Sequence, residues 1–105
     1  MDNKREIKFI AQAVKWFDKV NGNTYHSVNI TRTDTGEVVY CAWTYGYGDH
    51  YRQTALIAMA GAGWLGEKYS QGTDWYSFER ENNYPILWNV RDGLKRDMVA
   101  NGRAQ

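Results

Sequence analysis

The chain has 105 residues, with 13 Lys and Arg against 12 Asp and Glu and a formal net charge of +1. This length corresponds to one ordinary domain. The near-neutral charge excludes strong non-specific attraction to a polyanion, so any contact with nucleic acid must come from local clusters of basic residues. The single cysteine, Cys41, excludes an intrachain disulfide and a redox pair of cysteines.

The start of the sequence, "MDNKREIK", is charged and does not have the pattern of a secretory signal peptide. No apolar run approaches the roughly 18 residues of a membrane-spanning helix. We therefore expect a cytoplasmic protein that does not act at a membrane.

Three strands are predicted in the first half of the chain. Residues 7–17 form the first apolar stretch, and the Asn21-Gly22 pair that follows is a strong turn signal. Residues 24–33 ("TYHSVNITRT") alternate in the manner of a half-buried strand. The turn "DTGE" then leads to "VVYCAWTY". Because the connections are short, these strands are expected to form an antiparallel meander.

The period of the sequence changes after Gly48. Asp49 is a candidate helix cap, and the residues after it have apolar side chains three or four positions apart, which predicts a helix over residues 50–62. Residues 64–83 are polar with scattered aromatics and are expected to be a long loop or an appendage. "YPILWNV" predicts a last strand, extended to near Arg96 because Gly93 disfavours a helix. The expected fold is one compact α+β domain over residues 1–105, with an antiparallel sheet, the order β-β-β-α-β, and one main helix on a face of the sheet.

Two blocks of the sequence resemble a family of small uncharacterised proteins of bacteriophages and prophages. "WFDKVNGNTYHSV" and "YGYGDHYRQTA" match the family patterns W-F-x-K-x-x-G-N-T-Y-H-S-V and Y-G-Y-x-x-x-Y-x-Q-T-A, and a basic C-terminal segment follows. The resemblance covers roughly the first 60 residues and the last strand, and residues 64–83 have no counterpart. It implies a phage-type accessory protein in the host cytoplasm and supplies no activity.

The stretch "TYGYGDHYRQT" combines tyrosines and glycines at the predicted start of the helix. Free N–H groups at such a turn suit a phosphate or carboxylate, tyrosines can stack on a base, and an arginine can pair with a phosphate. Asp49 would repel an anion there, and neither phosphate-loop pattern is present. The alternative is a tight connection with no ligand. The candidate ligand-binding residues in this stretch are Tyr45, Gly46, Tyr47, Gly48 and Arg52.

A second candidate surface is basic and aromatic. Its cations would be Lys15, Arg32, Arg91, Lys95 and Arg96, interleaved with the rings of Trp16, Tyr25 and Trp88. Such a combination is typical of sites that bind single-stranded nucleic acid. The alternative is a solvated face whose Lys and Arg protect the sheet edge. Arg91 and Lys95 complete the predicted ligand-binding set.

His26, Asp49 and His50 are the residues on which a small nuclease or hydrolase would depend. No metal-binding spacing accompanies them, so no metal site is predicted. Packing is the alternative for His26, which is expected to share a face with Val28 and Ile30. Cys41 is expected to be an inert core residue.

The sequence therefore predicts a non-enzymatic binding protein without a cofactor. Its expected partner is a nucleotide-like or nucleic-acid ligand. The alternatives are a host protein, as for an inhibitor of a host defence complex, and the small nuclease or hydrolase. A homo-oligomer is compatible with all three.

Overall fold

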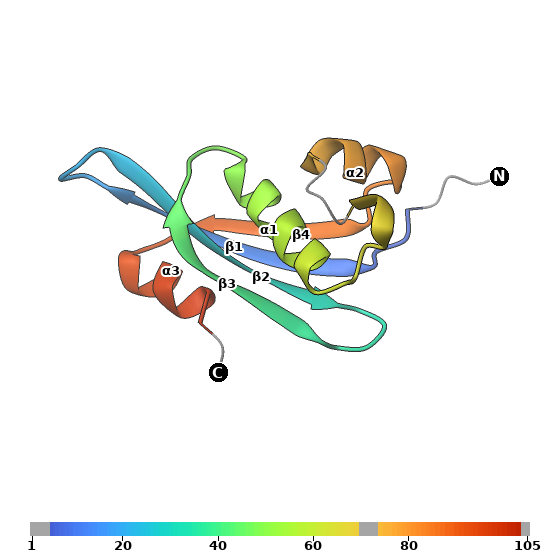
Figure 1. Cartoon of the computed structure of the whole chain (residues 1–105). Helices are drawn as coiled ribbons and strands as arrows, with labels where there is room; N and C mark the ends of the chain where they lie inside the picture. Colours follow the sequence, from blue (N-terminus) through green and yellow to red (C-terminus); the bar gives the residue numbers. More distant parts are fainter. Residues whose placement is uncertain (1–4, 70–73, 104–105) are drawn as a thin grey trace.

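The computed structural model describes residues 5–69 and 74–103, which form one sheet with helices on both faces (Figure 1). The elements, in chain order, are β1 (Phe9–Asp18), β2 (Asn23–Arg32), β3 (Val38–Tyr45), α1 (His50–Gly61), the 3-10 helix η1 (Glu67–Tyr69), α2 (Trp75–Glu81), β4 (Ile86–Asp92) and α3 (Lys95–Asn101). The α+β class, the first three strands and the helix after Gly48 are confirmed.

The sheet is mixed, and the expectation of a purely antiparallel sheet is wrong. Its order is β3-β2-β1-β4. The pairs β1–β2 and β2–β3 are antiparallel, but β4 lies parallel to β1, with Phe9 opposite Ile86. The long connection between β3 and β4 allows this arrangement, because it carries the chain back across the sheet before β4 begins.

The expected element order is also incomplete, because the structure has two more α-helices. In the segment expected to be a loop, the described residues form η1 and α2, while residues 70–73 of that segment lie outside the described part. The last strand ends at Asp92 rather than near Arg96, and α3 follows it after Gly93. Gly93 thus separates a strand from a helix instead of lying within a strand.

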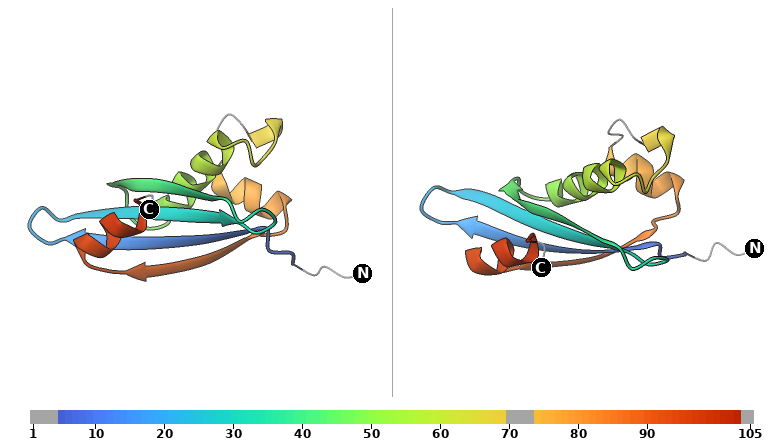
Figure 2. Two further views of the ribbon diagram at one scale, coloured as in Figure 1. Left: turned by 90° about the horizontal axis from the view of Figure 1, so that it is seen from below. Right: turned by 60° about the horizontal axis from the view of Figure 1, so that its bottom comes forward.

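Two layers of helix enclose the sheet (Figure 2). α1 and α2 lie on one face and α3 lies on the other. The main core is between α1 and the sheet, where α1 buries Tyr51, Ala55, Leu56 and Met59. The residues of β1, β2 and β4 that complete this core alternate along their strands: Phe9, Ala11, Ala13, Val28, Ile30 and Ile86.

The segment between α1 and β4 belongs to the same core. Tyr69 and Phe78 are buried with their rings edge to face, and the partly buried Trp64 and Trp75 pack against the same core. Trp64 also stacks on Phe9 of β1. The described residues of this segment are therefore an integral part of the domain and not an appendage.

Candidate functional site

The glycine-rich connection between β3 and α1 passes between two imidazole rings. A Cβ at Gly46 would lie 2.7 Å from His26 Cε1 and 2.8 Å from His50 Cγ, so only glycine fits there. Gly48 has a φ of 62°, a backbone conformation that glycine adopts without strain. Packing and backbone conformation account for both glycines without a ligand.

His26 is completely buried on β2, on the same face as Val28 and Ile30, as expected. Its Nδ1 lies 3.1 Å from the carbonyl oxygen of Gly46 and its Nε2 lies 2.8 Å from Thr54 Oγ1. The carbonyl can only accept, so Nδ1 carries a proton. The single proton of the Thr54 hydroxyl has two acceptors within reach, the His50 carbonyl at 3.3 Å and His26 Nε2 at 2.8 Å, and in the neutral ring Nε2 accepts it over the shorter distance. Burial holds the pKa of His26 below its usual value, and the nearby His50 and Lys15 lower it further, although the bond to Gly46 raises it. His26 thus joins β2, the glycine connection and α1.

Asp49 stands at the N-cap position of α1, but its side chain makes no capping hydrogen bond. The expectation that it caps the helix is wrong. Its carboxylate instead lies 3.8 Å from Arg52 Nε, one turn into the helix. Among the described residues, no carboxylate is hydrogen-bonded to His26 or His50.

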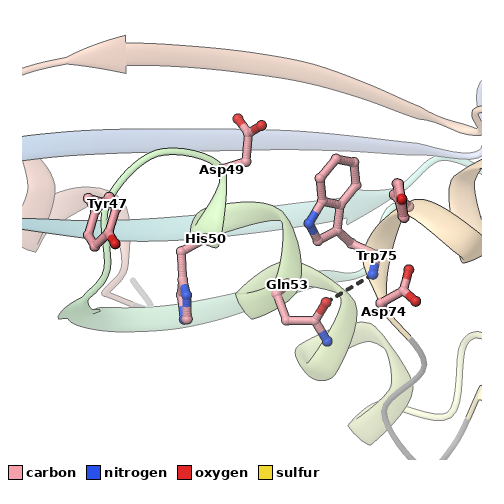
Figure 3. A pocket seen from close by; sticks show the side chains of 7 residues that line it. Tyr47, Asp49, His50, Gln53, Asp74 and Trp75 are labelled. Atoms are coloured by element: carbon pink, nitrogen blue, oxygen red, sulfur yellow. Dashed lines mark hydrogen bonds between the residues drawn. The ribbon is translucent and has the colours of Figure 1, made fainter.

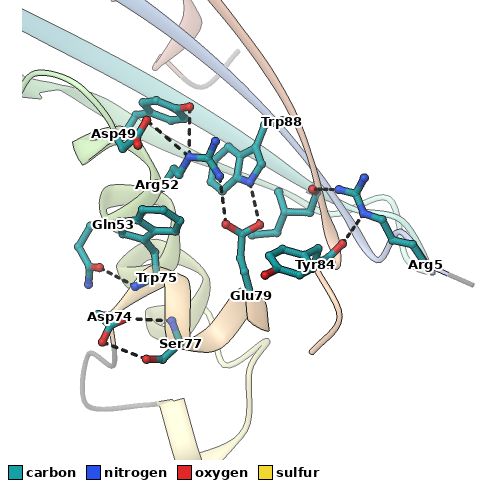
Figure 4. Close-up of polar contacts among 12 residues, drawn as sticks. Arg5, Asp49, Arg52, Gln53, Asp74, Trp75, Ser77, Glu79, Tyr84 and Trp88 are labelled. Carbon is teal, nitrogen blue, oxygen red and sulfur yellow. Dashed lines mark hydrogen bonds and ion pairs between the residues drawn. The ribbon is translucent and has the colours of Figure 1, made fainter. Parts of the chain in front are cut away.

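Arg52 is held by two carboxylates, those of Asp49 and Glu79, and by the rings of Tyr51, Trp75 and Trp88 (Figure 4). Its Nη1 lies 3.2 Å from Oε2 of Glu79, which is only 2% exposed. The other oxygen of Glu79 accepts from Trp88 Nε1 at 3.0 Å. The guanidinium also lies 4.9 Å from the ring centroid of Trp75 and 5.2 Å from that of Trp88. Arg52 is therefore engaged in joining α1, α2 and β4.

An open groove of about 540 Å³ lies between the start of α1 and the start of α2 (Figure 3). Both of its carboxylates already have partners. Asp74 accepts from the backbone N–H and the hydroxyl of Ser77, and Asp49 is the carboxylate beside Arg52. The two negative charges also disfavour a phosphate. The groove is lined by Tyr47, Asp49, His50, Gln53, Asp74, Trp75 and Tyr76.

Four aromatic side chains form a continuous row on the opposite face of the sheet, the face covered in part by α3. Trp16 of β1 stacks on Tyr25 of β2, with ring centroids 5.7 Å apart. Tyr25 in turn meets Trp43 and Tyr45 of β3 edge to face, at 5.4 and 5.8 Å. Trp43 is 44% exposed and Tyr45 is 55% exposed. We call Trp16, Tyr25, Trp43 and Tyr45 the aromatic row.

A bulge in β3 creates this row. The pairing of β2 with β3 shifts between His26 and Val28, so that β3 has one extra residue there. Trp43 and Tyr45 consequently both contact Tyr25. Trp43 is a site residue that was not predicted, although its spacing of two from Tyr45 on a strand indicates that the two side chains share a face.

Basic residues gather beside the aromatic row. The Lys95 ammonium lies 5.6 Å from the ring centroid of Trp16. Arg91 pairs with Val14, which lies two residues before Trp16 on β1 and faces the same side. The Arg91 guanidinium lies close to Gly93, since its Nη1 is 3.3 Å from the position that a Cβ on Gly93 would occupy. Arg96 and Arg103 of the α3 segment, together with Lys95, line a shallow surface at that helix.

The structure thus divides the predicted site residues between two faces. Tyr45, Arg91 and Lys95 lie on the α3 side, whereas Tyr47 and Arg52 lie on the α1 side, and Gly46 and Gly48 belong to the connection at the end of β3. Other members of the predicted basic set are dispersed. Lys15 lies over the Tyr51 ring on the α1 face, Arg32 pairs with Asp34, and Trp88 packs against Tyr51.

Cys41 is a partly buried thiol that packs against the main core. Burial raises its pKa to about 11, so the thiol stays protonated and unreactive at neutral pH. Within residues 5–69 and 74–103, no group of three or more His, Cys, Asp or Glu side chains is arranged to hold a metal ion.

Comparisons with known proteins add no family to this description. No protein-family model, no curated protein and no solved structure matches the chain. The resemblance to small phage proteins therefore stays a prediction. In the described part of the chain, no helix has the length and apolar character needed to cross a membrane.

Proposed function

We propose that this protein is a non-enzymatic binding protein, of phage-accessory type, that holds single-stranded nucleic acid against the aromatic row. The observation that carries the proposal is the row itself, four rings over three neighbouring strands with a lysine over one end. Stacking on such rings tolerates any base sequence, because every base has a π-face. Trp43 and Tyr45 offer the exposed ring surface.

The charge of the surroundings supports the same ligand. Arg91 and Lys95 lie beside the row, and Arg96 and Arg103 continue along α3. Carboxylates also lie in this region: Asp97 accepts from the backbone N–H of Leu94, and Asp18 interacts electrostatically with Lys95. A local excess of cations lets a chain of net charge +1 hold a polyanion. The groove on the other face is a less favourable site for a phosphate, because it contains the two carboxylates of Asp49 and Asp74.

Fluorescence anisotropy with labelled strands of about 12 nucleotides, a length within the range of single-strand sites, tests the proposal. DNA, RNA and a duplex of equal length are compared at several salt concentrations. We expect single strands to bind more tightly than the duplex. If Arg91, Lys95 and Arg96 each contact one phosphate, the slope of log K against log salt is roughly −2.

Matched variants locate the site. Trp43→Ala or Tyr45→Ala is expected to weaken binding roughly 5- to 150-fold, the equivalent of about 1–3 kcal/mol for each stacked base. Lys95→Gln should reduce the magnitude of the salt slope by about 0.7. Tyr76→Ala is the control, because Tyr76 is an exposed tyrosine of α2 on the opposite side of the sheet.

Two results would contradict the proposal. If no strand binds at low salt, nucleic acid is excluded as the ligand. A host protein is then the remaining partner, because exposed Trp and Tyr are also typical of protein interfaces. Binding that Tyr47→Ala abolishes but Trp43→Ala leaves intact would place the ligand in the groove beside α1 instead.

A further inference from the structure

β3 is an edge strand whose outer backbone groups are free to pair. In the described sheet it has β2 as its one neighbour. Arg32 N donates to the Glu37 carbonyl just before β3, and Gly46 N donates to the Thr24 carbonyl just after it. Because inward and outward residues alternate in an antiparallel ladder, the N–H and C=O groups of Val38, Tyr40 and Tyr45 point away from β2.

The strand has a bulge between Cys41 and Thr44, but it lacks the charged residues and proline that most often keep edge strands from pairing. No Asp, Glu, Lys, Arg, His or Pro occurs from Val38 to Gly48. Large side chains on it are exposed, at Val38, Tyr40, Trp43 and Tyr45. The other edge strand, β4, contains Arg91 and Asp92. α1 and α3 lie over the two faces of the sheet (Figure 2), and no described strand pairs with the outer edge of β3.

We propose that β3 pairs antiparallel with β3 of a second copy of this chain, forming a dimer with one continuous sheet. A neutral strand can lie beside itself without repulsion between like charges. The antiparallel two-fold arrangement puts the two Glu37 carboxylates at opposite ends of the contact, whereas a parallel one would put them side by side. It also closes the assembly, while β3-to-β4 pairing would continue from copy to copy without end.

The two-fold axis of this dimer is perpendicular to the sheet, so each face of the sheet continues across the contact. Both α3 helices and both aromatic rows then lie on the same side. Val38 and Tyr40 of one protomer come close to the Trp43–Tyr45 end of β3 in its partner. The dimer does not depend on the nucleic-acid proposal, since it follows from the edge alone.

Size-exclusion chromatography with light scattering tests the dimer. The 12.2 kDa chain should elute with twice its own mass, and the mass should fall on dilution. The double substitution Val38→Lys and Tyr40→Lys places charges at the contact and should give a monomer. Leu87→Lys is the matched control, because Leu87 is 46% exposed on the opposite edge strand, β4, and should leave the dimer intact.

Hydrogen exchange of the wild-type protein gives a second readout that needs no variant to fold. The amides of Val38, Tyr40 and Tyr45 should be protected at high concentration and lose protection on dilution, while the β1–β2 amides stay protected at both. A wild-type monomer at its highest soluble concentration would overturn the proposal. A folded Lys double variant that remains dimeric would overturn it too, as would rapid exchange of the three amides at every concentration.

Discussion

Asp49 and Asp74 stand at the same position before α1 and α2, but only Asp74 caps its helix. Its carboxylate accepts from Ser77 N at 2.8 Å, and this bond holds the pKa of Asp74 below its usual value of 3.8. Asp74→Ala should therefore lower the melting temperature by roughly a few degrees, whereas Asp49→Ala should change it little. Thermal melts of the two variants make the comparison.

The pH dependence of this cap has a definite sign. A carboxylate whose pKa falls on folding stabilises the native state above its unfolded pKa and loses that effect as it is protonated. The difference between wild type and Asp74→Ala should be complete above pH 3.8 and shrink as the pH falls below it. Equal melting temperatures at neutral pH would contradict the role of Asp74 as a cap.

His26 should make the stability of the domain depend on pH near neutrality. Burial lowers the pKa of His26 below 6.5 in the folded protein, so the unfolded chain binds more protons between these two values. The free energy of unfolding should be highest above pH 6.5 and decrease as the pH falls through that window. Urea unfolding from pH 7.5 to pH 5 measures the change.

The control for this prediction is His26→Gln. Glutamine can still donate to the Gly46 carbonyl and accept from Thr54, but it does not titrate. The variant should lose most of the decrease between pH 6.5 and pH 5. A decrease of unchanged size would show that His26 is not its source.

At the scale of elements, the Arg52–Glu79 pair joins helix to helix and helix to sheet. Arg52 lies on α1, Glu79 on α2, and Trp88, which also donates to Glu79, lies on β4. Arg52→Ala would leave a buried carboxylate with one donor fewer, and we expect a loss of about 3 kcal/mol, the lower end for buried pairs, because the arginine keeps some contact with water. Urea denaturation measures this loss.

A double-mutant cycle separates the pair from its surroundings. Arg52→Ala combined with Glu79→Ala should cost clearly less than the sum of the single changes, because the second change removes the uncompensated charge left by the first. Arg80→Ala is the control, since Arg80 is an arginine of α2 that stacks on the exposed Tyr76 ring. Strict additivity would mean that Arg52 and Glu79 contribute independently.

Sequence patterns predicted the elements whose formation depends on local signals. The alternation in β2, the turns before β2 and β3 and the spacing of apolar residues in α1 are all local signals, and the elements they predicted are found in the structure. α2 and α3 have seven residues each, too few for a stable isolated helix, so they depend on packing. Asp74 directly before an aromatic run was the one local signal for α2.

The candidate site was predicted only in part for a similar reason. Tyr45 and Lys95 were selected as single residues, but their side of the sheet depends on the β3 bulge and on α3, and no local pattern gives either. Arg52 was assigned to a ligand because its real partner, Glu79, lies 27 residues away in the sequence. Tertiary contacts decide on which face of the sheet each basic side chain lies, and a single sequence does not reveal those contacts.

At the scale of the whole molecule, the sheet is held between two helical layers by contacts distant in sequence. α3 packs on β1 and β2, which lie more than 60 residues earlier in the chain, and Met98 of α3 is completely buried. The Ser27 hydroxyl donates to the Met98 carbonyl, and a Cβ on Gly102 would clash with the Cys41 carbonyl. The second layer thus fits the sheet as closely as the first.

Asn101 provides the sharpest test of whether the two layers form one cooperative unit. Its side-chain amide donates to the Gln12 carbonyl at 3.1 Å and to the Ser27 carbonyl at 3.2 Å, and its Oδ1 accepts from Asn29 at 3.0 Å. Asn101→Ala removes these bonds, while Asn29 Nδ2 keeps the Asn101 backbone carbonyl as an acceptor at 2.9 Å, and the change should cost about 2 kcal/mol. The urea midpoint should fall with an unchanged slope if α3 unfolds together with the sheet.

Asn89→Ala, at an exposed asparagine on β4, is the control and should leave the midpoint in place. The result expected if α3 does not unfold together with the sheet is clearly different for Asn101→Ala. If α3 is a separate, weakly attached element, the midpoint will stay the same and only the amides of α3 will exchange faster. We expect the whole transition to shift, because Met98 and Val14 are buried where α3 meets the sheet, and water would reach them if α3 detached.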